Sequence, residues 1–565
     1  MQRGHLHEAA AIAEVAASYA ATNHCGIFSS PRLESMLERI GERLPPTENK
    51  YGTRRGYCSS PTKILHVATV VLPIGGHSRM LWRWIEEDTG RRHSVALTRQ
   101  VGNPIPEPLR AAVSRSSGTI YRINGARGSL LRWASRLRAI AADADMVILH
   151  VHPHDVIPSI AFSNRQPRPP VILVNHADHL FWLGSRSSDV VVSLREAGMR
   201  LSYARRGVKS QRGALLPIPL KLIRRNMHRA EAKKRLGLAD FDIVLLCVAR
   251  SLKFGSKDGI SYAHAHVPVL MRHPEAALVV VGAGGGKEWS DASDQVNGRI
   301  LTVPETEDTE LYYQAADVYV DSYPFVSNTS LLEAGGCGLP LVSRYHAVPG
   351  SEIFDAGAPG LTSCLVRAAD LNEYTNLLSR IISDEAFRLC LGEETSASIR
   401  SMHVGAGWIT ALDQVYQLCR EVPDVETSYI SSEEQPSTGD LDVLTLETYG
   451  GQRSFEDVIR ASLRIMPPSL RFRQWCRLRE ARPDEDNQPR WMQVRHLLPE
   501  WLLCRTRHLW RPLYKSCLRP GQFGKLRAAR QQVAGVGRPK DPPPAVTCQS
   551  AVRRVAARSA GTLVE

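Results

Sequence analysis

Short apolar runs alternate with longer amphipathic segments from residue 63 onward. ILHVATVVL at 64–72 is rich in Val and Ile, which predicts a strand that is buried on both faces. A Gly75-Gly76 turn and a helix-like run, HSRMLWRWIEEDTG, follow this strand. Four further strands are predicted at 92–98, 145–152, 169–177 and 189–194. Because helix-like segments separate most of these strands, the pattern indicates parallel βα units.

The same pattern restarts after residue 225. DIVLLCVAR at 242–250 predicts a buried strand, and AALVVVGAGGG at 276–286 predicts a strand followed by a glycine turn. Further strands are predicted at 299–303, 317–325 and 339–344. Two such blocks predict an α/β protein with two doubly wound, Rossmann-like domains, residues 61–225 and 226–420, that face each other across a cleft.

The two ends of the chain differ from this body. Residues 1–60 predict a leader that is poorly ordered or helical. Residues 421–450 hold eight acidic residues and no Lys or Arg, which is typical of an acidic linker. Residues 451–565 hold 23 Lys and Arg against nine Asp and Glu, and they interleave Arg with Trp and Leu. We expect a basic helical extension there, disordered at its end.

Composition narrows the class of protein without naming a function. The 565-residue chain is 43% hydrophobic and 23% charged, as globular proteins are, so global disorder is excluded. The sequence has no apolar run of about 18 residues and no secretory signal, so neither a membrane-spanning helix nor secretion is expected. The 11 cysteines include no CxxC pair, which favours a reducing cytosol over a zinc or disulfide framework.

The tract DVYVDSYPFVSNTSLLEAGGCGLPLVSR at 317–344 holds the first candidate site. Its order of strand, loop and helix places Ser327, Asn328 and Thr329 at a helix N-terminus, where free N–H groups and the helix dipole bind anions. Glu333 lies one turn into that helix. There a carboxylate can accept hydrogen bonds from both hydroxyls of a ribose while the helix start holds a diphosphate. The alternative is an ordinary helix cap with a solvated carboxylate.

This tract resembles the nucleotide-sugar segment of GT-B glycosyltransferases, particularly the GT4-like group. In that family a helix glutamate precedes small residues, then Gly-x-Pro and a strand; the corresponding residues are Glu333, Gly338 and Pro340. Three other segments follow the family's order: VAR at 248–250, VVVGAG at 279–284 and QAADVYVDSYPF at 314–325. The resemblance covers residues 63–420. It implies a GT-B fold, glycosyl transfer from a nucleotide sugar, and no metal or other cofactor.

One position departs from the family. Retaining GT4-like enzymes carry a second glutamate eight positions before the ribose glutamate, and that position here is Phe325. The resemblance therefore does not imply whether the reaction retains or inverts configuration. A GT-B sugar-nucleotide epimerase and a catalytically silent nucleotide-binding scaffold stay open as alternatives.

Two loops that follow predicted strands supply further candidates. In the family, an arginine and a lysine after the VAR segment neutralise the donor diphosphate; Arg250 matches the arginine, and Lys253 or Lys257 matches the lysine. Cations there stabilise the charge on a departing nucleoside diphosphate. Gly75 and Gly76 match a glycine pair in the family's first loop, and glycine lets the backbone approach a ligand closely. The alternatives are a solvated basic loop and a plain tight turn.

Histidines gather after two predicted strands. HVHPHD contains His152 and His154, and NHADH contains His176 and Asp178. The carboxyl ends of parallel strands face the ligand crevice. His176 matches a family histidine that contacts the transferred sugar, and the others are candidates to orient or deprotonate an acceptor hydroxyl. A metal site and ordinary hydrogen-bonded loop residues are the alternatives.

The sequence thus predicts a glycosyltransferase that moves a sugar from a nucleotide-sugar donor to a hydroxyl of a glycan, lipid-linked or protein acceptor. The catalytic candidates are His176, Asp178 and Arg250. The Arg- and Trp-rich segment 470–515 suits contact with a membrane surface; nucleic-acid binding and ordinary helical packing are the alternatives. We expect a cytoplasmic protein, at the inner face of a membrane if that contact exists.

Overall fold

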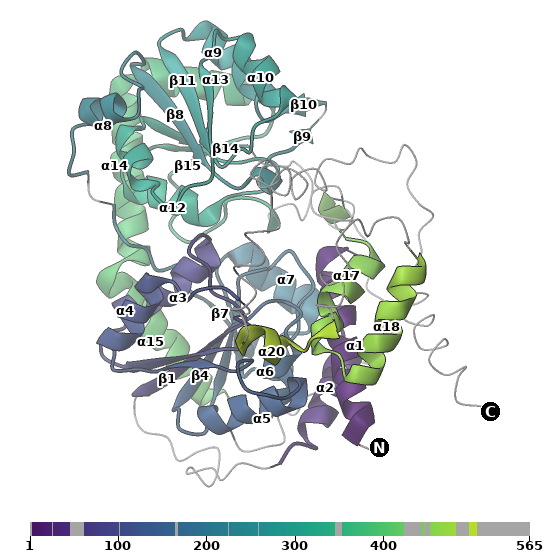
Figure 1. Cartoon of the computed structure of the whole chain (residues 1–565). Helices are drawn as coiled ribbons and strands as arrows, with labels where there is room; N and C mark the ends of the chain where they lie inside the picture. The colour runs from purple at the N-terminus through teal and green to yellow at the C-terminus, as the bar shows by residue number, and fades with distance from the viewer. Residues whose placement is uncertain are drawn as a thin grey trace.

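Two α/β domains, one above the other in Figure 1, form the body of the protein in this computed structural model. The structure describes residues 3–24, 26–45, 61–100, 102–163, 168–223, 225–257, 259–344, 353–422, 442, 444–446, 453–481 and 497–505 of the 565-residue chain. Each domain contains a parallel sheet with apolar clusters on both of its faces. The predicted α/β fold class with two Rossmann-like domains is confirmed.

The sheet of the first domain has seven parallel strands in the order β3-β2-β1-β4-β5-β6-β7. The strands are β1 (Lys63–Ala68), β2 (Arg92–Leu97), β3 (Ile120–Arg122), β4 (Met146–His150), β5 (Val171–Asn175), β6 (Val190–Ser193) and β7 (Gly213–Leu215). Ile64 and Ile148 pack into one apolar cluster, and Leu65 and Leu149 pack into another. Because both faces are covered, the central strands consist of nearly unbroken apolar residues.

Helices connect the strands of the first sheet. They are α3 (Gly76–Glu87), α4 (Glu107–Arg115), α5 (Leu130–Ala141), α6 (Val156–Ala161) and α7 (Glu196–Arg206). Gly75, the residue before α3, has φ 128°, a backbone conformation that other residues rarely adopt. Asp155 caps α6, and its side chain accepts the N–H of Ile157 at 3.1 Å. Both helices begin after the loop that follows a strand, α3 after β1 and α6 after β4, at the carboxyl edge of the sheet.

The sheet of the second domain has six parallel strands in the order β12-β11-β8-β13-β14-β15. They are β8 (Ile243–Val248), β11 (Ala276–Val281), β12 (Ile300–Val303), β13 (Val318–Val320), β14 (Leu341–Arg344) and β15 (Leu365–Ala368). The helices are α8 (Arg229–Arg235), α9 (Val267–Arg272), α10 (Lys287–Asp294), α11 (Glu310–Ala315), α12 (Asn328–Gly336), α13 (Leu371–Ser383) and α14 (Glu385–His403). A two-stranded hairpin, β9 (Ser256–Lys257) and β10 (Ile260–Ser261), follows β8.

The helix after α14 returns to the first domain. Trp408, Leu412 and Tyr416 of α15 (Gly405–Glu421) share an apolar cluster with the first sheet. The sequence analysis assigned residues up to 420 to the second domain, so the packing of α15 differs from that assignment. The apolar periodicity of α15 marks a buried face but does not identify the sheet that covers it.

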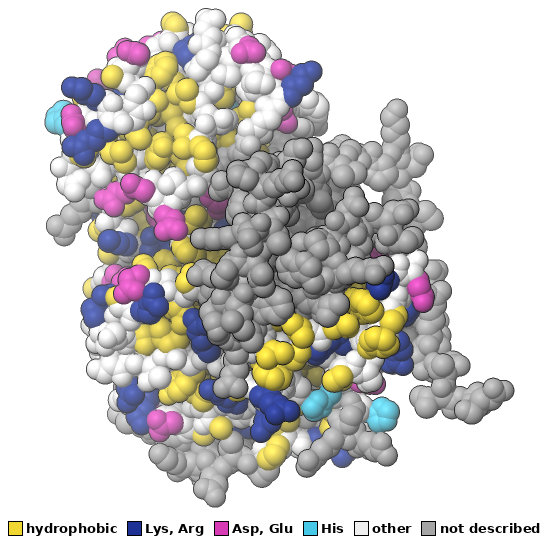
Figure 2. All heavy atoms as spheres, viewed as in Figure 1, with side chains coloured by type: hydrophobic (Ala, Val, Ile, Leu, Met, Phe, Trp, Pro, Cys, Tyr) yellow, Lys and Arg dark blue, Asp and Glu magenta, His cyan; other side chains and the backbone are white. Residues whose placement is uncertain are grey.

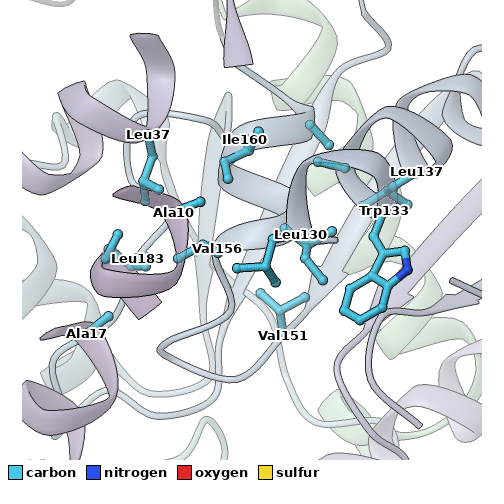
Figure 3. Close-up of a cluster of buried hydrophobic side chains, with 14 of the residues drawn as sticks. Ala10, Ala17, Leu37, Leu130, Trp133, Leu137, Val151, Val156, Ile160 and Leu183 are labelled. Carbon is cyan, nitrogen blue, oxygen red and sulfur yellow. The ribbon is translucent and has the colours of Figure 1, made fainter. Parts of the chain in front are cut away.

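Helices from the described N-terminal and C-terminal regions pack on the flank of the first domain. The helices there are α1 (Arg3–Thr22), α2 (Pro31–Gly41), α17 (Phe455–Ser462), α18 (Pro468–Ala481) and α20 (Glu500–Arg505). Figure 3 shows how Ala10 and Ala17 of α1 and Leu37 of α2 join the cluster that contains Val156 and Ile160 of α6. The expected leader is thus helical within 3–45, whereas 46–60, most of 421–450, and 506–565 lie outside the described residues.

Candidate functional site

The loops that follow the strands of the two sheets meet between the domains, where α3 lies below α12 in Figure 1. A Cβ atom on Gly76 would lie 2.3 Å from the Oγ1 atom of Thr329, so the turn before α3 touches the first turn of α12. The Nη2 atom of Arg250 donates to the carbonyl oxygen of Ile74 at 3.2 Å. The structure therefore brings together the glycine pair, the start of α12 and the basic loop. The sequence analysis proposed these three elements only as separate candidates.

Glu333 lies one turn into α12 with its side chain 1% exposed. Its Oε1 atom accepts from Arg79 at 3.0 Å and from Arg83 at 2.6 Å. Its Oε2 atom accepts from Arg79 at 3.1 Å and from the hydroxyl of Tyr313 at 3.3 Å. The alternative interpretation, a solvated carboxylate, therefore does not hold. The carboxylate of Glu333 is instead paired with two arginines from the other domain. Sequence reasoning missed both arginines, because no local pattern links α3 to α12.

The start of α12 combines backbone donors with polar side chains. The Ser327 N–H donates to the Oδ1 atom of Asp321 at 3.1 Å, and the Ser327 hydroxyl donates to the hydroxyl of Ser330 at 3.3 Å. Ser327 is the N-cap residue, but its side chain accepts no capping hydrogen bond. The Oδ1 atom of Asn328 is buried without a hydrogen-bond partner. The first-turn N–H groups have no partner within the helix, so this end of α12 can bind an anion.

The basic loop after β8 places one lysine at this helix start. The Nζ atom of Lys253 donates to the carbonyl oxygen of Val326 at 2.7 Å and lies 5.0 Å from the ring centroid of Phe325. Burial lowers the pKa of Lys253, and the neighbouring Asp321 carboxylate opposes that shift. Phe325 occupies the position where the resembled family has a glutamate, so a cation–π contact stands where a carboxylate was expected.

The other two candidate cations are Arg250 and Lys257. Arg250 is half exposed and its Nε atom donates to the Oε1 atom of Glu305 at 3.0 Å. Lys257 belongs to β9, but its side chain lies outside the described residues. Of the two lysines that the sequence left open, Lys253 is therefore the one that the structure brings to the start of α12.

His176 follows β5 and stacks on a histidine that the sequence analysis did not single out. The rings of His176 and His77 lie 3.8 Å apart between centroids with an interplanar angle of 21°. Burial lowers the pKa of His176 to about 4 and that of His77 well below its usual value, so both imidazoles are neutral near pH 7. His77 directly follows the Gly75-Gly76 turn, and this position in the first turn of α3 was the signal that could have found it.

Two histidines of HVHPHD, His150 and His152, lie around His77, with ring centroids 6.4 Å and 6.2 Å from its ring. His150 is fully buried and joins a chain of imidazoles inside the domain: its Nε2 atom lies 3.0 Å from His66 Nδ1, and His66 Nε2 lies 3.0 Å from His93 Nδ1. His154 lies near Arg99, and burial lowers the pKa of His154 to about 3. Across the described residues, no group of three or more His, Cys, Asp or Glu side chains is placed to hold a metal ion.

Asp178 is paired rather than free to accept a proton. Its two carboxylate oxygens accept from Arg195 at 2.9 Å and 2.6 Å. Burial alone would raise the pKa of Asp178, but Arg195 holds it below its usual value. Arg195 also donates to the carbonyl oxygens of Ile353 and Asp355 in the second domain, each at 2.7 Å. The pair therefore joins the two domains beside His176.

A family model matches part of the second domain. Residues 242–384 match a family model described as Glycosyl transferases group 1. A D-inositol 3-phosphate glycosyltransferase of Thermobifida fusca is 28% identical over 207 residues, which is 34% of this chain and 46% of that protein. A protein of the same name from Corynebacterium jeikeium is 28% identical over 169 residues, which is 27% of this chain and 38% of that protein. The chain thus spans less than half the length of these curated relatives.

A solved structure also resembles this chain. The crystal structure of Anabaena HepE in complex with UDP and glucose aligns with 63% of this chain and 98% of its own, at 16% sequence identity and a TM-score of 0.47.

Proposed function

We propose that the whole chain, whose residues 242–384 match the Glycosyl transferases group 1 family model, transfers a sugar from a nucleotide-sugar donor to an acceptor hydroxyl. The single observation that carries the proposal is the contact between the start of α12, the basic loop after β8 and the Gly75-Gly76 turn. These are the three elements that such a donor requires: anion-binding N–H groups, cations and a closely approaching backbone.

Each donor group has a candidate partner on the second domain. The N–H groups of Asn328 and Thr329 and the hydroxyl of Ser327 bind the diphosphate, and Glu333 binds the ribose hydroxyls. Arg250 and Lys253 face the diphosphate as it departs, where fixed positive charge stabilises the developing negative charge. Each charge-assisted contact of this kind contributes roughly 1.5–3 kcal/mol.

The first domain supplies the opposite wall. Gly75 and Gly76 let the backbone approach the phosphates, and His176 contacts the transferred sugar as a neutral imidazole. Asp178 keeps its charge through Arg195, so we assign it the role of orienting this wall rather than that of a general base. With Phe325 in place of the expected carboxylate, the contact with the donor sugar differs from that of retaining GT4-like enzymes.

The first experiment is a thermal-shift and isothermal-titration screen with UDP, GDP and ADP and their sugars. A bound ligand raises the melting temperature by mass action, so the base that binds identifies the donor. Glu333→Ala and Arg250→Ala should each weaken nucleotide binding and slow turnover by about tenfold or more. Glu310→Ala and Arg272→Ala, which replace an exposed carboxylate and an exposed guanidinium of the same domain, should change neither. Unchanged binding and turnover in Glu333→Ala and Arg250→Ala would refute the assignment.

Acceptors can be screened once the donor is known. The curated relatives are named for D-inositol 3-phosphate, so a phosphorylated polyol is the first acceptor to test, followed by glycans, lipid-linked sugars and peptides. Product formation with one class and not with the others assigns the acceptor. Donor hydrolysis without transfer to any of them would leave glycosyl transfer unsupported.

We also propose that α18 contacts an anionic membrane surface. Phe472 is 58% exposed and stacks with Trp475 at 6.1 Å between ring centroids, while the Arg479 guanidinium lies 5.0 Å from the Trp475 ring. Aromatic side chains beside basic ones suit the headgroup region. No helix among the described residues is long and apolar enough to cross a membrane. Cosedimentation with phosphatidylglycerol vesicles should fall in Phe472→Ala and not in Leu389→Ala, a similarly exposed apolar residue of α14.

A further inference from the structure

The peptide that leads into α12 is held between two side chains of opposite charge. Its carbonyl group belongs to Val326, and its N–H belongs to Ser327, the N-cap residue of the helix. The Nζ atom of Lys253 donates to the carbonyl oxygen at 2.7 Å, and the Oδ1 atom of Asp321 accepts the N–H at 3.1 Å. Because the C=O and N–H of a trans peptide point in opposite directions, the ammonium and the carboxylate lie on opposite sides of it. Together they fix the orientation from which the first turn of α12 begins.

Asp321 also fastens the loop between β13 and α12. Its Oδ1 atom accepts the N–H of Ser322 at 2.8 Å, and the Ser322 hydroxyl donates to the carbonyl oxygen of Phe325 at 2.7 Å. Its Oδ2 atom is buried and has no hydrogen-bond partner among the described residues. Figure 2 shows acidic and basic side chains on the surface where the two domains meet, but Asp321 is only 3% exposed. A buried carboxylate with an unmet oxygen is costly, so its charge needs a cation nearby.

Lys253 supplies that cation and depends on Asp321 in return. Burial raises the pKa of Asp321, whereas the Ser327 N–H and Lys253 lower it. Burial lowers the pKa of Lys253, and the Asp321 carboxylate opposes that change. Two cations near the lysine, Arg195 and Arg250, lower its pKa further. The positive charge of Lys253 is therefore maintained by Asp321 against both burial and the two arginines.

The remaining titratable groups around this pair are neutral near pH 7. They are His179 and Cys247 beside Lys253, and Cys247, Tyr319 and Tyr374 beside Asp321. Burial lowers the pKa of the histidine and raises the pKa of the thiol and of both phenols. None of these groups supplies the negative charge that Lys253 needs.

We infer that Asp321 is a positioning residue of the donor site, which keeps Lys253 charged and, through Ser327, holds the first turn of α12 in place for the diphosphate. Asp321 itself contacts no part of the donor. It acts by favouring the proton on the Nζ atom of Lys253, and the contacts between the two domains stay as they are. The inference rests on the proposed function, because it takes Lys253 and the start of α12 to be the diphosphate ligands.

Replacing the carboxylate by an amide separates its charge from its shape. Asp321→Asn keeps an oxygen that can accept both N–H groups. Without the negative charge, we expect Lys253 to lose its proton about one pH unit earlier as the pH rises. One unit is a tenfold change in the charged fraction above the pKa, so the variant should bind sugar nucleotides about tenfold more weakly at about pH 8.5. At about pH 6 the lysine is charged in both proteins, so this deficit should disappear.

The experiment combines calorimetry with lysine acetylation of the full-length protein. UDP-glucose, GDP-mannose and ADP-glucose are the probes, because their diester phosphates do not titrate near neutral pH. The matching nucleosides carry no phosphate, so their affinities should be the same in the wild type and in Asp321→Asn. Acetic anhydride reacts with the neutral amine alone, so acetylation from about pH 6 to 10, read by peptide mass spectrometry, measures the pKa of Lys253 without a ligand.

Two further variants complete the comparison. Lys253→Arg should remove the pH dependence of sugar-nucleotide binding, because a guanidinium keeps its charge at every pH used. Asp240→Asn is the matched control, since Asp240 is an exposed carboxylate in the turn before β8, at the opposite edge of the same sheet. It should alter neither measurement. Thermal melting confirms that each variant is folded.

Two results would overturn the role of Asp321. An unchanged pKa of Lys253 in the folded Asp321→Asn variant would show that the carboxylate does not keep the lysine charged. Equal weakening of nucleosides and sugar nucleotides at both pH values would show that Asp321 only stabilises the loop. If no probe binds even the wild type, the proposed function fails and the assignment to a donor site fails with it. The acetylation then still decides whether Asp321 maintains the charge of Lys253.

Discussion

The two domains have the same plan and different interiors. Both are parallel sheets whose carboxyl edges face each other, but the first sheet buries His66, His93 and His150, whereas the second buries Tyr313 and Tyr319 at comparable depth. The family model matches only the second domain. Burial raises the pKa of tyrosine, so a buried tyrosine keeps its proton and stays neutral. Burial lowers the pKa of histidine, so a buried histidine stays neutral in mild acid while the same residue in the unfolded chain becomes protonated. The second domain also buries two histidines with lowered pKa values, His266 and His403, so we expect mild acid to destabilise the first domain, with its chain of three, more strongly than the second.

The largest predicted effect tests this difference with pH. In the imidazole chain, the Nε2 atom of His93 lies 2.9 Å from the carbonyl oxygen of Asp88, which can only accept, so His93 must donate there. It follows that His66 donates to His93 and His150 donates to His66, with all three rings neutral. Burial lowers the pKa of all three, to about 3 for His150.

The free energy of unfolding should fall as the pH falls, because the unfolded chain binds protons more readily than the folded one. Because the folded pKa lies below the unfolded value of about 6.5, the unfolded chain takes up protons first as the pH falls through 6.5. Each such histidine lowers the free energy of unfolding by about 1.4 kcal/mol per pH unit below that value, so three of them remove about 4 kcal/mol per unit. Urea unfolding at pH 7.5, 6.5 and 5.5, with hydrogen exchange read by peptide, measures this. Earlier exposure of the second domain would contradict it.

The next effect concerns the ion pair that joins the domains. Arg195→Ala leaves Asp178 buried without its cation and removes the donors to Ile353 and Asp355, so we expect a loss of about 3–5 kcal/mol in unfolding free energy. The second domain offers a matched case, Asp317.

Asp317 accepts from Arg229 at 2.7 Å and pairs with Lys233 at 2.8 Å. Arg229→Ala leaves Lys233 in place and should therefore cost less than Arg195→Ala, about 1 kcal/mol. Equal losses in the two variants, measured by urea unfolding, would show that Lys233 does not compensate for the loss of Arg229 at Asp317.

A third prediction compares two glycines of the second domain that both have a positive φ. Only one of them has a neighbouring atom that an added Cβ would strike. Gly282 has φ +93°, and a Cβ atom there would lie 2.3 Å from the carbonyl oxygen of Ala249, so Gly282→Ala should cost about 2–4 kcal/mol. Gly285 has φ +73° with no atom within 4 Å of an added Cβ, so Gly285→Ala should cost only about 1 kcal/mol. Chemical unfolding of both variants gives the difference. Equal costs would mean that the neighbouring strand end moves to accept the methyl group.

These cases also show which parts of the site could be predicted from the sequence. Glu333 and Thr329 stand on one helix, so strand–loop–helix order was enough to propose them. Lys253 was proposed from the family resemblance, which left Lys257 open as the alternative. Arg79 and Arg83 were missed because they reach Glu333 from a helix about 250 positions away in the chain. Contacts between elements far apart in sequence leave no periodic trace.

The same reason explains the rest of the fold. The βα alternation predicted both sheets, since apolar runs buried on two faces are unmistakable. It did not predict that α15 would cross back to the first sheet, nor that Ala10 and Ala17 of the N-terminal helix would enter its core. An amphipathic helix has a buried face in any arrangement, and only tertiary packing decides which surface covers it.

The smallest predicted effect tests whether α15 belongs energetically to the first domain. The hydroxyl of Tyr416 donates to the Oδ2 atom of Asp88 at 3.0 Å and accepts from the Trp84 indole N–H at 3.1 Å. Tyr416→Phe removes both bonds and leaves a buried indole donor without its acceptor, so we expect a loss of about 1–2 kcal/mol. Tyr312→Phe, at a partly exposed position of the second domain, should stay within about 0.5 kcal/mol of the wild type. Hydrogen exchange should rise in the first domain alone, because the lost bonds connect α15 to α3 and to the residue that follows it; faster exchange confined to α13 and α14 would instead assign α15 to the second domain.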